Sequence, residues 1–153
     1  MQQSKVKVLV ISIAQPILVG IYEDNILIET ITKEGKTSDI LPLIFKNILN
    51  KYSIDNIFYV SGPGSYMAIK IAYIFLKTIT IVNGINLYAV SGFDFNNNGP
   101  IKALGKKYFY RNNDEINIQL LGDNKIEEFK LPLEFANIKF TIDALPKYNL
   151  PAV

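Results

Sequence analysis

The stretch VSGPGSYMAIKIAYIFLKTITIV, residues 60–82, contains the part of this sequence that most resembles a ligand-binding motif. An apolar run ends at a valine, two glycines flank a proline, and a long apolar segment follows. A strand, a glycine turn and a helix in this order build many phosphate sites, because the backbone N–H groups at a helix N-terminus attract anions. Gly62, Gly64 and Ser65 are therefore the candidate anion-binding residues.

The spacing in this turn does not match the specific phosphate motifs. A Walker A loop needs a lysine and a hydroxyl after its last glycine, whereas Gly64 is followed by Ser65. A dinucleotide loop needs a third glycine three residues after the second, where this chain has Met67. On spacing alone, we favour a structural turn in which Gly62 and Gly64 supply backbone angles that other residues resist.

The absence of two residue types excludes much catalytic chemistry. The sequence contains no cysteine and no histidine, which removes thiolate nucleophiles, zinc–thiolate sites and the commonest general base. Serine–histidine and cysteine–histidine nucleophile pairs are therefore impossible within this chain. The paired carboxylates Asp114-Glu115 and Glu127-Glu128 lie beside expected turns and are interpreted as solvated. We predict no catalytic residue, no metal site and no cofactor.

Composition indicates a globular chain without a broad nucleic-acid surface. Hydrophobic residues make up 49% and charged residues 20% of 153 residues, and the formal net charge is +2. The basic and aromatic segment KKYFYR, 106–111, is a local candidate for RNA contact, although the edge strand of a hairpin is the favoured interpretation. The most apolar segment, 67–82, is shorter than the roughly 20 residues of a membrane span and contains two lysines. We expect a cytoplasmic protein without a membrane segment.

Hydrophobic patterning predicts elements in the order β-β-β-α-β-α-β. Apolar, β-branched runs predict strands at 5–13, 17–22, 26–31, 56–61 and 85–90, with a tight hairpin turn at 23–25. Helices are expected from a cap at Ser38 to about Tyr52, and from about Ser65 to Asn83. Three antiparallel strands followed by helix-linked parallel strands define an α/β ribonuclease-H-like lobe, the repeated unit of actin-like ATPases.

The rest of the chain is expected to form a shorter second unit. We predict a ribonuclease-H-like lobe over residues 1–95 and a truncated second lobe over residues 96–153. So short a segment cannot bury a sizeable core of its own, so it should pack on the first lobe. Hairpins are expected there, with turns at Gly105-Lys106 and at Gly122-Asp123-Asn124.

Several segments of the chain resemble the pattern of the TsaB (YeaZ) family. GPGSYMAIKIAY, 62–73, resembles the family signature GPGSFTGLRIGL, and INLYAVSGFDF, 85–95, resembles its IPLVGVSSLEAL segment. DILPLIFKNIL, 39–49, and IKALGKKYFYR, 101–111, resemble the family's leucine-rich helix and later hairpin. The resemblance covers roughly residues 5–111.

This resemblance implies a non-catalytic scaffold, the dimerisation subunit of the machinery that makes threonylcarbamoyladenosine in tRNA. Such a chain docks through its helix pair onto the catalytic TsaD subunit, or onto itself as a homodimer. The resemblance further implies a TsaE-like ATPase as another component of the complex, with tRNA contacted only indirectly.

The chain departs from the family at positions tied to nucleotide chemistry. Family members usually begin ILAIDTS, with an aspartate at the end of the first strand, whereas this chain reads VLVISIAQP and has Ser12 there. In active actin-like ATPases that aspartate organises the metal and the phosphates. Met67, Ala68, Lys70 and Ala72 also replace a threonine, a glycine, an arginine and a glycine of the signature. The second hypothesis is an active ATPase or phosphotransferase, and Ser12 counts against it. The third is a self-associating module that has lost the pathway.

The second helix carries more apolar surface than a sheet can cover. Twelve of the sixteen residues 67–82 are apolar, with a polar stripe at Lys70, Lys77 and Thr80, whereas a helix on one sheet needs an apolar arc only a little wider than about 100°. Either other parts of the chain cover the surplus or a partner does. For a partner, the predicted interface set is Ile69, Lys70, Tyr73 and Leu76, together with Leu43 of the first helix.

A nucleotide test follows from Ser12. Because Mg²⁺ prefers carboxylate oxygens and the first strand offers none at Ser12, we expect the isolated chain to bind Mg-ATP weakly and to hydrolyse none. Isothermal titration calorimetry and a phosphate-release assay measure both properties. Micromolar affinity, or turnover that rises with the purity of the preparation, would contradict the prediction.

Overall fold

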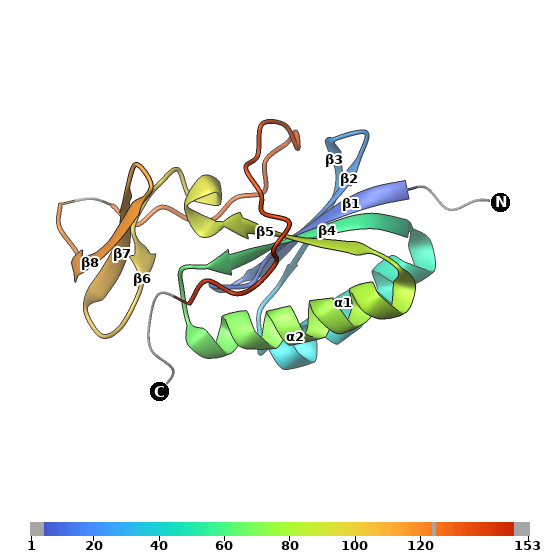
Figure 1. The fold of residues 1–153 in the computed structure, drawn as a ribbon, viewed down its shortest axis with the longest axis horizontal. Helices are drawn as coiled ribbons and strands as arrows, with labels where there is room; N and C mark the ends of the chain where they lie inside the picture. Colours follow the sequence, from blue (N-terminus) through green and yellow to red (C-terminus); the bar gives the residue numbers. More distant parts are fainter. Residues whose placement is uncertain (1–4, 124, 149–153) are drawn as a thin grey trace.

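The computed structural model describes residues 5–123 and 125–148, and its centre is a five-stranded sheet (Figure 1). The strands lie in the order β3-β2-β1-β4-β5. β1, β2 and β3 are antiparallel neighbours, whereas β4 and β5 run parallel to β1. The strand bounds are Lys5–Ile11 for β1, Ile17–Glu23 for β2, Ile26–Lys33 for β3, Ser53–Gly62 for β4 and Asn86–Ser91 for β5.

The element order and strand order confirm the ribonuclease-H-like class predicted from the sequence. The predicted hairpin turn between β2 and β3 is formed by Asp24 and Asn25, whose φ angles are 51° and 64°. Two successive residues with positive φ match the twist of a two-residue hairpin. β4 and β5 each follow a helix, as parallel neighbours joined by crossover connections do.

Two helices cover one face of the sheet (Figure 1): α1, Thr37–Lys51, and α2, Tyr66–Asn83. Their buried side chains pack on alternate strand residues such as Val8, Val10 and Tyr59, because successive residues of a strand point to opposite faces. The two helices also contact each other through the rings of Phe45 and Phe75, whose centroids are 5.9 Å apart.

The start of α1 differs from the prediction. The sequence predicts Ser38 as the N-cap, but the N-cap residue is Lys36, and no side chain caps the helix. The Asp39 and Ile40 N–H groups instead donate to the Lys36 carbonyl oxygen at 3.0 and 2.9 Å. Asp39 remains favourable in the first turn, because its negative charge lies near the positive end of the helix dipole.

The opposite face of the sheet is covered by the C-terminal segment, residues 125–148, which forms no helix. At the β3 edge, the Leu27 N–H donates to the Leu133 carbonyl oxygen at 2.9 Å. The Phe135 ring then packs on Phe58 of β4, with centroids 4.5 Å apart. The extended segment therefore buries the face that the helices leave uncovered.

The same segment crosses the edge of β5 and reaches the helix side of the sheet (Figure 1). Thr141 and Ala89 exchange two backbone hydrogen bonds of 2.9 and 3.1 Å. Ala144 then lies buried among the side chains of the helix-side core. Its carbonyl oxygen accepts a hydrogen bond from the Tyr59 hydroxyl, whose pKa is raised by burial.

A second sheet of three strands lies beyond β5. It follows a short 3-10 helix, η1, and has the order β6-β7-β8. The bounds are Gly92–Phe95 for η1, Ile101–Lys102 for β6, Lys107–Asn112 for β7 and Glu115–Leu120 for β8. The hairpin predicted at Gly105-Lys106 is confirmed, with Gly105 at φ 57°. The KKYFYR segment is predicted at an edge, but β7 is the central strand and its Phe109 is fully buried.

The second predicted hairpin is wrong. Its turn is placed at Gly122-Asp123-Asn124, of which Asn124 lies outside the described residues. β8 pairs with β7 across a turn that contains Asn113, with φ of 57°. Residues 125–131 form no strand and belong to the segment that returns to the first sheet.

The predicted division at residues 95 and 96 falls between η1 and the small sheet. The chain beyond that point has two different roles, because residues 101–120 form the small sheet and residues 125–148 cover the first one. Residues 125–148 therefore belong to the core of the first sheet, although the sequence assigns them to the second unit.

Gly62 is the position where the backbone most needs a glycine. Its φ is 151°, and a Cβ there would lie 1.9 Å from the Lys147 carbonyl oxygen. The Lys147 N–H also donates to the Ser61 carbonyl oxygen at 2.7 Å, which fixes this approach. We expect Gly62→Ala to lower the free energy of unfolding by about 2–4 kcal/mol, measured by urea denaturation.

Gly64→Ala is the matched control for Gly62→Ala. Its φ lies outside the left-handed region, and an added Cβ would meet Ile13 at 3.3 Å. We expect a loss below about 1 kcal/mol for this control. Equal losses at Gly62 and Gly64 would contradict the assignment of backbone strain to Gly62.

Candidate functional site

The glycine turn between β4 and α2 packs into the protein interior. Gly62 and Gly64 are both buried, and Ile13 lies beside Gly64. The sequence predicts unusual backbone angles at both glycines, but only Gly62 has a positive φ. The turn therefore serves first to connect β4 to α2, and Ile13 occupies the space next to Gly64.

Ser65 begins α2 as its N-cap. Its hydroxyl accepts a hydrogen bond from the Ala68 N–H at 3.5 Å. The helix ends at Gly84, which has the left-handed conformation at φ 65° that favours glycine at a helix C-terminus. Of the three candidate anion residues, Ser65 thus already has a local structural partner, and Gly62 and Gly64 are covered by packing.

The end of β1 carries no visible metal site. Ser12 follows the strand directly and is 4% exposed. Within residues 5–123 and 125–148, no group of three or more aspartate, glutamate, histidine or cysteine residues is placed to hold a metal ion.

The inner face of α2 corrects the predicted interface. The buried residues of the helix are Ile69, Ala72, Leu76 and Thr80. Ile69 and Leu76 are predicted to face outward, but both are 0% exposed and pack in the core. Thr80, which the sequence assigns to the polar stripe, is also buried, and its hydroxyl donates to the Lys77 carbonyl oxygen at 2.9 Å. The side of α2 that carries Ile69 and Leu76, next to Lys70 and Lys77, was expected to be exposed and instead faces the core.

The outer face of α2 carries a row of largely apolar residues, in which Thr78 is the one polar member. Met67, Ile74 and Ile81 are 58%, 53% and 71% exposed. Together with the half-buried Ile71 and the exposed Thr78 they follow a spacing of four, three, four and three residues. This is the heptad spacing of a helix that packs along another helix. We call these five residues, Met67, Ile71, Ile74, Thr78 and Ile81, the outer stripe.

The remaining predicted interface residues lie around this stripe in different environments. Tyr73 is half-buried, and its ring lies 6.2 Å from that of Tyr59. Lys70 is exposed, with its ammonium 5.7 Å from the centre of the Tyr66 ring. Leu43 of α1 is 63% exposed. Lys70 and Leu43 are thus accessible, whereas Tyr73 is committed in part to intramolecular packing.

By length and composition alone, α2 is also apolar enough to cross a membrane, and it is the one such helix in the described part of the chain. Of its four buried residues, Ala72 and Leu76 belong to the core cluster that α2 forms with the sheet and α1. It also connects β4 to its parallel neighbour β5, so both of its ends are fixed to one sheet. These contacts make it a core helix with a surplus apolar face.

The fold places the chain among α/β proteins of the actin-like, ribonuclease-H-like class. It is similar to the solved structure of YeaZ from Pseudomonas aeruginosa, with a TM-score of 0.59 and 13% identity over 86% of this chain and 72% of that one. A second similar structure is described as an uncharacterized protein with similarity to peptidase YEAZ from Pseudomonas aeruginosa. Its TM-score is 0.53 at 13% identity, over 87% of this chain and 72% of that one.

Sequence comparison adds no relative to these two structures. A scan against protein-family models gave no match, and a search of curated proteins gave none either. The resemblance to TsaB (YeaZ) seen in the sequence is therefore matched at the level of the fold.

The cap at Ser65 gives a test of the glycine turn. A bond of 3.5 Å is long, so we expect Ser65→Ala to cost about 0.5 kcal/mol, the low end for an N-cap. Any effect of inorganic phosphate on the melting temperature should be the same in the parent and in the variant. Thermal melts followed by circular dichroism measure both. A phosphate-dependent rise that is lost in Ser65→Ala would instead establish an anion site at the helix start.

Proposed function

We propose that this chain is a non-catalytic docking subunit of the TsaB (YeaZ) kind. Its partner would be the TsaD-like catalytic subunit of tRNA threonylcarbamoyladenosine formation, with a TsaE-like ATPase as a further component. The observation that carries the proposal is the outer stripe of α2, a mostly exposed and largely apolar row with heptad spacing. The similarity of the fold to YeaZ supports the choice of family.

The outer stripe has the properties of one half of a helix pair. Exposed apolar rows of this kind are costly in water and are typical of interaction sites. The row runs from Met67 to Ile81, which is almost the whole of α2. A stable interface buries about 800 Å² on each partner, so neighbouring residues such as Val82, 76% exposed, and Leu43 would belong to its margin.

Charge beside the stripe favours a different chain as the partner. Lys70 and Lys77 each precede one stripe residue, Ile71 and Thr78, and both are exposed. If two copies of α2 paired in antiparallel fashion, these flanking lysines would face each other, because such positions meet their own equivalents across an antiparallel pair. Like charges across an interface oppose association. We infer a partner helix with acidic residues beside its apolar seam, and the homodimer is the less favoured assembly.

The chemistry of the complex would reside in the partner. Ser12 at the end of β1 offers no carboxylate to a metal ion, which opposes the alternative of an active ATPase. The contribution of this chain would be to position the catalytic subunit through α2, while its own sheet and helices keep α2 rigid.

The central test changes one residue in the middle of the outer stripe. We expect Ile74→Glu to weaken binding to a purified TsaD-like subunit from the same organism by about 100-fold or more, because a buried unpaired charge is strongly unfavourable. Titration calorimetry gives the affinity, and light scattering gives the mass of the complex. The circular dichroism of the variant should stay native, since Ile74 is 53% exposed.

Two further variants serve as controls for this test. Gln119→Glu adds the same charge at an exposed position of β8, away from the two helices, and should leave binding unchanged. Ile69→Glu places a charge at a 0% exposed core position and should unfold the chain. Wild-type affinity in Ile74→Glu, or a parent that binds no TsaD-like subunit, would refute the docking role.

A further inference from the structure

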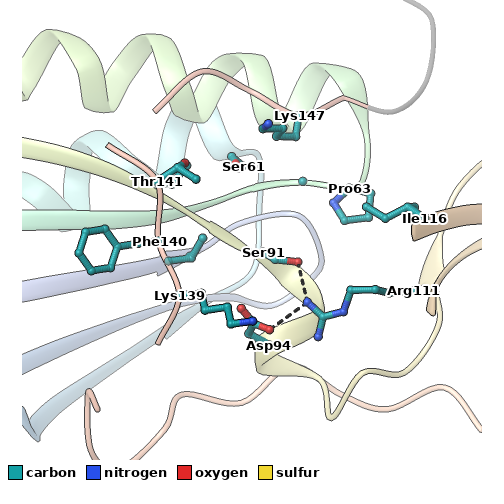
Figure 2. A pocket seen from close by; sticks show the side chains of 13 residues that line it. Ser61, Pro63, Ser91, Asp94, Arg111, Ile116, Lys139, Phe140, Thr141 and Lys147 are labelled. Atoms are coloured by element: carbon teal, nitrogen blue, oxygen red, sulfur yellow. Dashed lines mark hydrogen bonds and ion pairs between the residues drawn. The ribbon is translucent and has the colours of Figure 1, made fainter. Parts of the chain in front are cut away.

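A cleft lies where the carboxyl ends of β4 and β5 meet the small sheet and the C-terminal segment (Figure 2). Its volume is about 260 Å³, slightly below the roughly 300–1,000 Å³ of typical ligand sites. In α/β folds, ligands bind beyond the carboxyl ends of parallel strands. Ser12 is not among the residues that line the cleft.

The walls of the cleft are largely apolar. Phe140 lies on one side, and Pro63 and Ile116 lie together on the other (Figure 2). Val90 adds a further apolar surface from the end of β5. Such walls suit a flat, apolar body rather than a bare inorganic ion.

Three cations and one carboxylate lie around these walls. Arg111 comes from β7, and Lys139 and Lys147 come from the C-terminal segment. The carboxylate is that of Asp94, which is 3.0 Å from Arg111 Nη1. No ion pair in the described part of the chain involves Lys139 or Lys147. The lining therefore has a positive excess in a chain whose formal net charge is only +2.

Arg111, the only arginine of the chain, is held in a fixed orientation. Its Nε donates to Asn98 Oδ1 at 2.8 Å, and its guanidinium lies 5.1 Å from the centre of the Phe93 ring. Nη1 bonds to Asp94 and, at 3.5 Å, to the Ser91 hydroxyl. Nη2 has no hydrogen bond to any described residue. A guanidinium oriented in this way can donate to a planar anionic group with little loss of side-chain entropy.

Ser61 adds a hydroxyl group to the lining of the cleft. The residue lies at the carboxyl end of β4 and is only 4% exposed. A polar group of a ligand could form a hydrogen bond with this hydroxyl in addition to its contacts with the cations.

We propose that this cleft binds a small organic anion, a carboxylate or phosphate ester with a flat apolar body. The anionic group would lie near Arg111, Lys139 and Lys147, and the apolar body would lie between Phe140 and Ile116. Because these residues belong to the small sheet and the C-terminal segment, the ligand would hold both parts against the ends of β4 and β5. Binding only to the folded state must then raise the melting temperature.

The test uses the full chain and naphthalene probes that differ only in charge. We expect 1-naphthoate and 1-naphthyl phosphate to shift the amide resonances of cleft residues in NMR titrations and to raise the melting temperature. The neutral 1-naphthamide should bind about tenfold more weakly or worse, because it lacks the charge-assisted hydrogen bonds. The stronger of the two acids identifies the preferred anionic group.

Variants at the two unpaired lysines complete the test. The double variant Lys139→Gln, Lys147→Gln should bind the acids at least about tenfold more weakly, with native circular dichroism. Lys46→Gln, at an exposed position on α1, is the matched control and should bind as the parent does.

Three results would overturn the proposal. These are equal binding of 1-naphthamide, unchanged affinity in the double variant, and shifts confined to residues outside the cleft. The outcome is separate from that of the docking test, because no residue of the outer stripe lines the cleft. Ile74→Glu should bind the acids as the parent does.

Discussion

The path of the C-terminal segment, residues 125–148, determines which surfaces of this protein remain open. The segment hydrogen-bonds to β3 through Leu133 and to β5 through Thr141, and so it contacts both edges of the central sheet. Unpaired sheet edges are sites of unwanted association, and an uncovered apolar face would be unstable in water. Both problems are solved here by an extended chain rather than by further helices. The outer stripe of α2, on the far side of the helices, is the apolar surface that this segment does not reach.

Much of the first lobe could be predicted because its signals are local. Alternating and β-branched runs identify the five strands, and the turn at Asp24 and Asn25 has the residue types that accept positive φ. The conformation and packing of residues 125–131 could not be predicted in the same way. β8 has the expected strand pattern, but its partner is β7, and residues such as Phe129 pack on the sheet face instead of pairing. Pairing of this kind depends on contacts distant in sequence, which periodicity does not contain.

The wrong prediction of which face of α2 is exposed has a different physical origin. A helical wheel gives the width of the apolar arc but not the direction of the sheet. Lys70 and Lys77 separate two apolar rows, and the row with Ile69 and Leu76 proves to be the core. The buried Thr80 strengthened the wrong orientation, because its hydroxyl is satisfied by a carbonyl of its own helix. Ile69, Ala72 and Leu76 follow the same spacing of three and four residues as the outer row, so the spacing alone could not tell which row faces the sheet.

The cleft illustrates why a site can be missed when its residues are individually ordinary. Lys139 and Lys147 lie far from Arg111 and Ser61 in the sequence, and only the return of the C-terminal segment brings them together.

The glycine turn is the element common to the cleft and to α2. Gly62 lines the cleft on one side of this turn, and Ser65 begins α2 on the other. Because the turn is buried and Gly62 lies against the Lys147 backbone, both the cleft and α2 depend on one rigid feature. The stripe and the cleft nevertheless share no side chain, so each can change without altering the residues of the other.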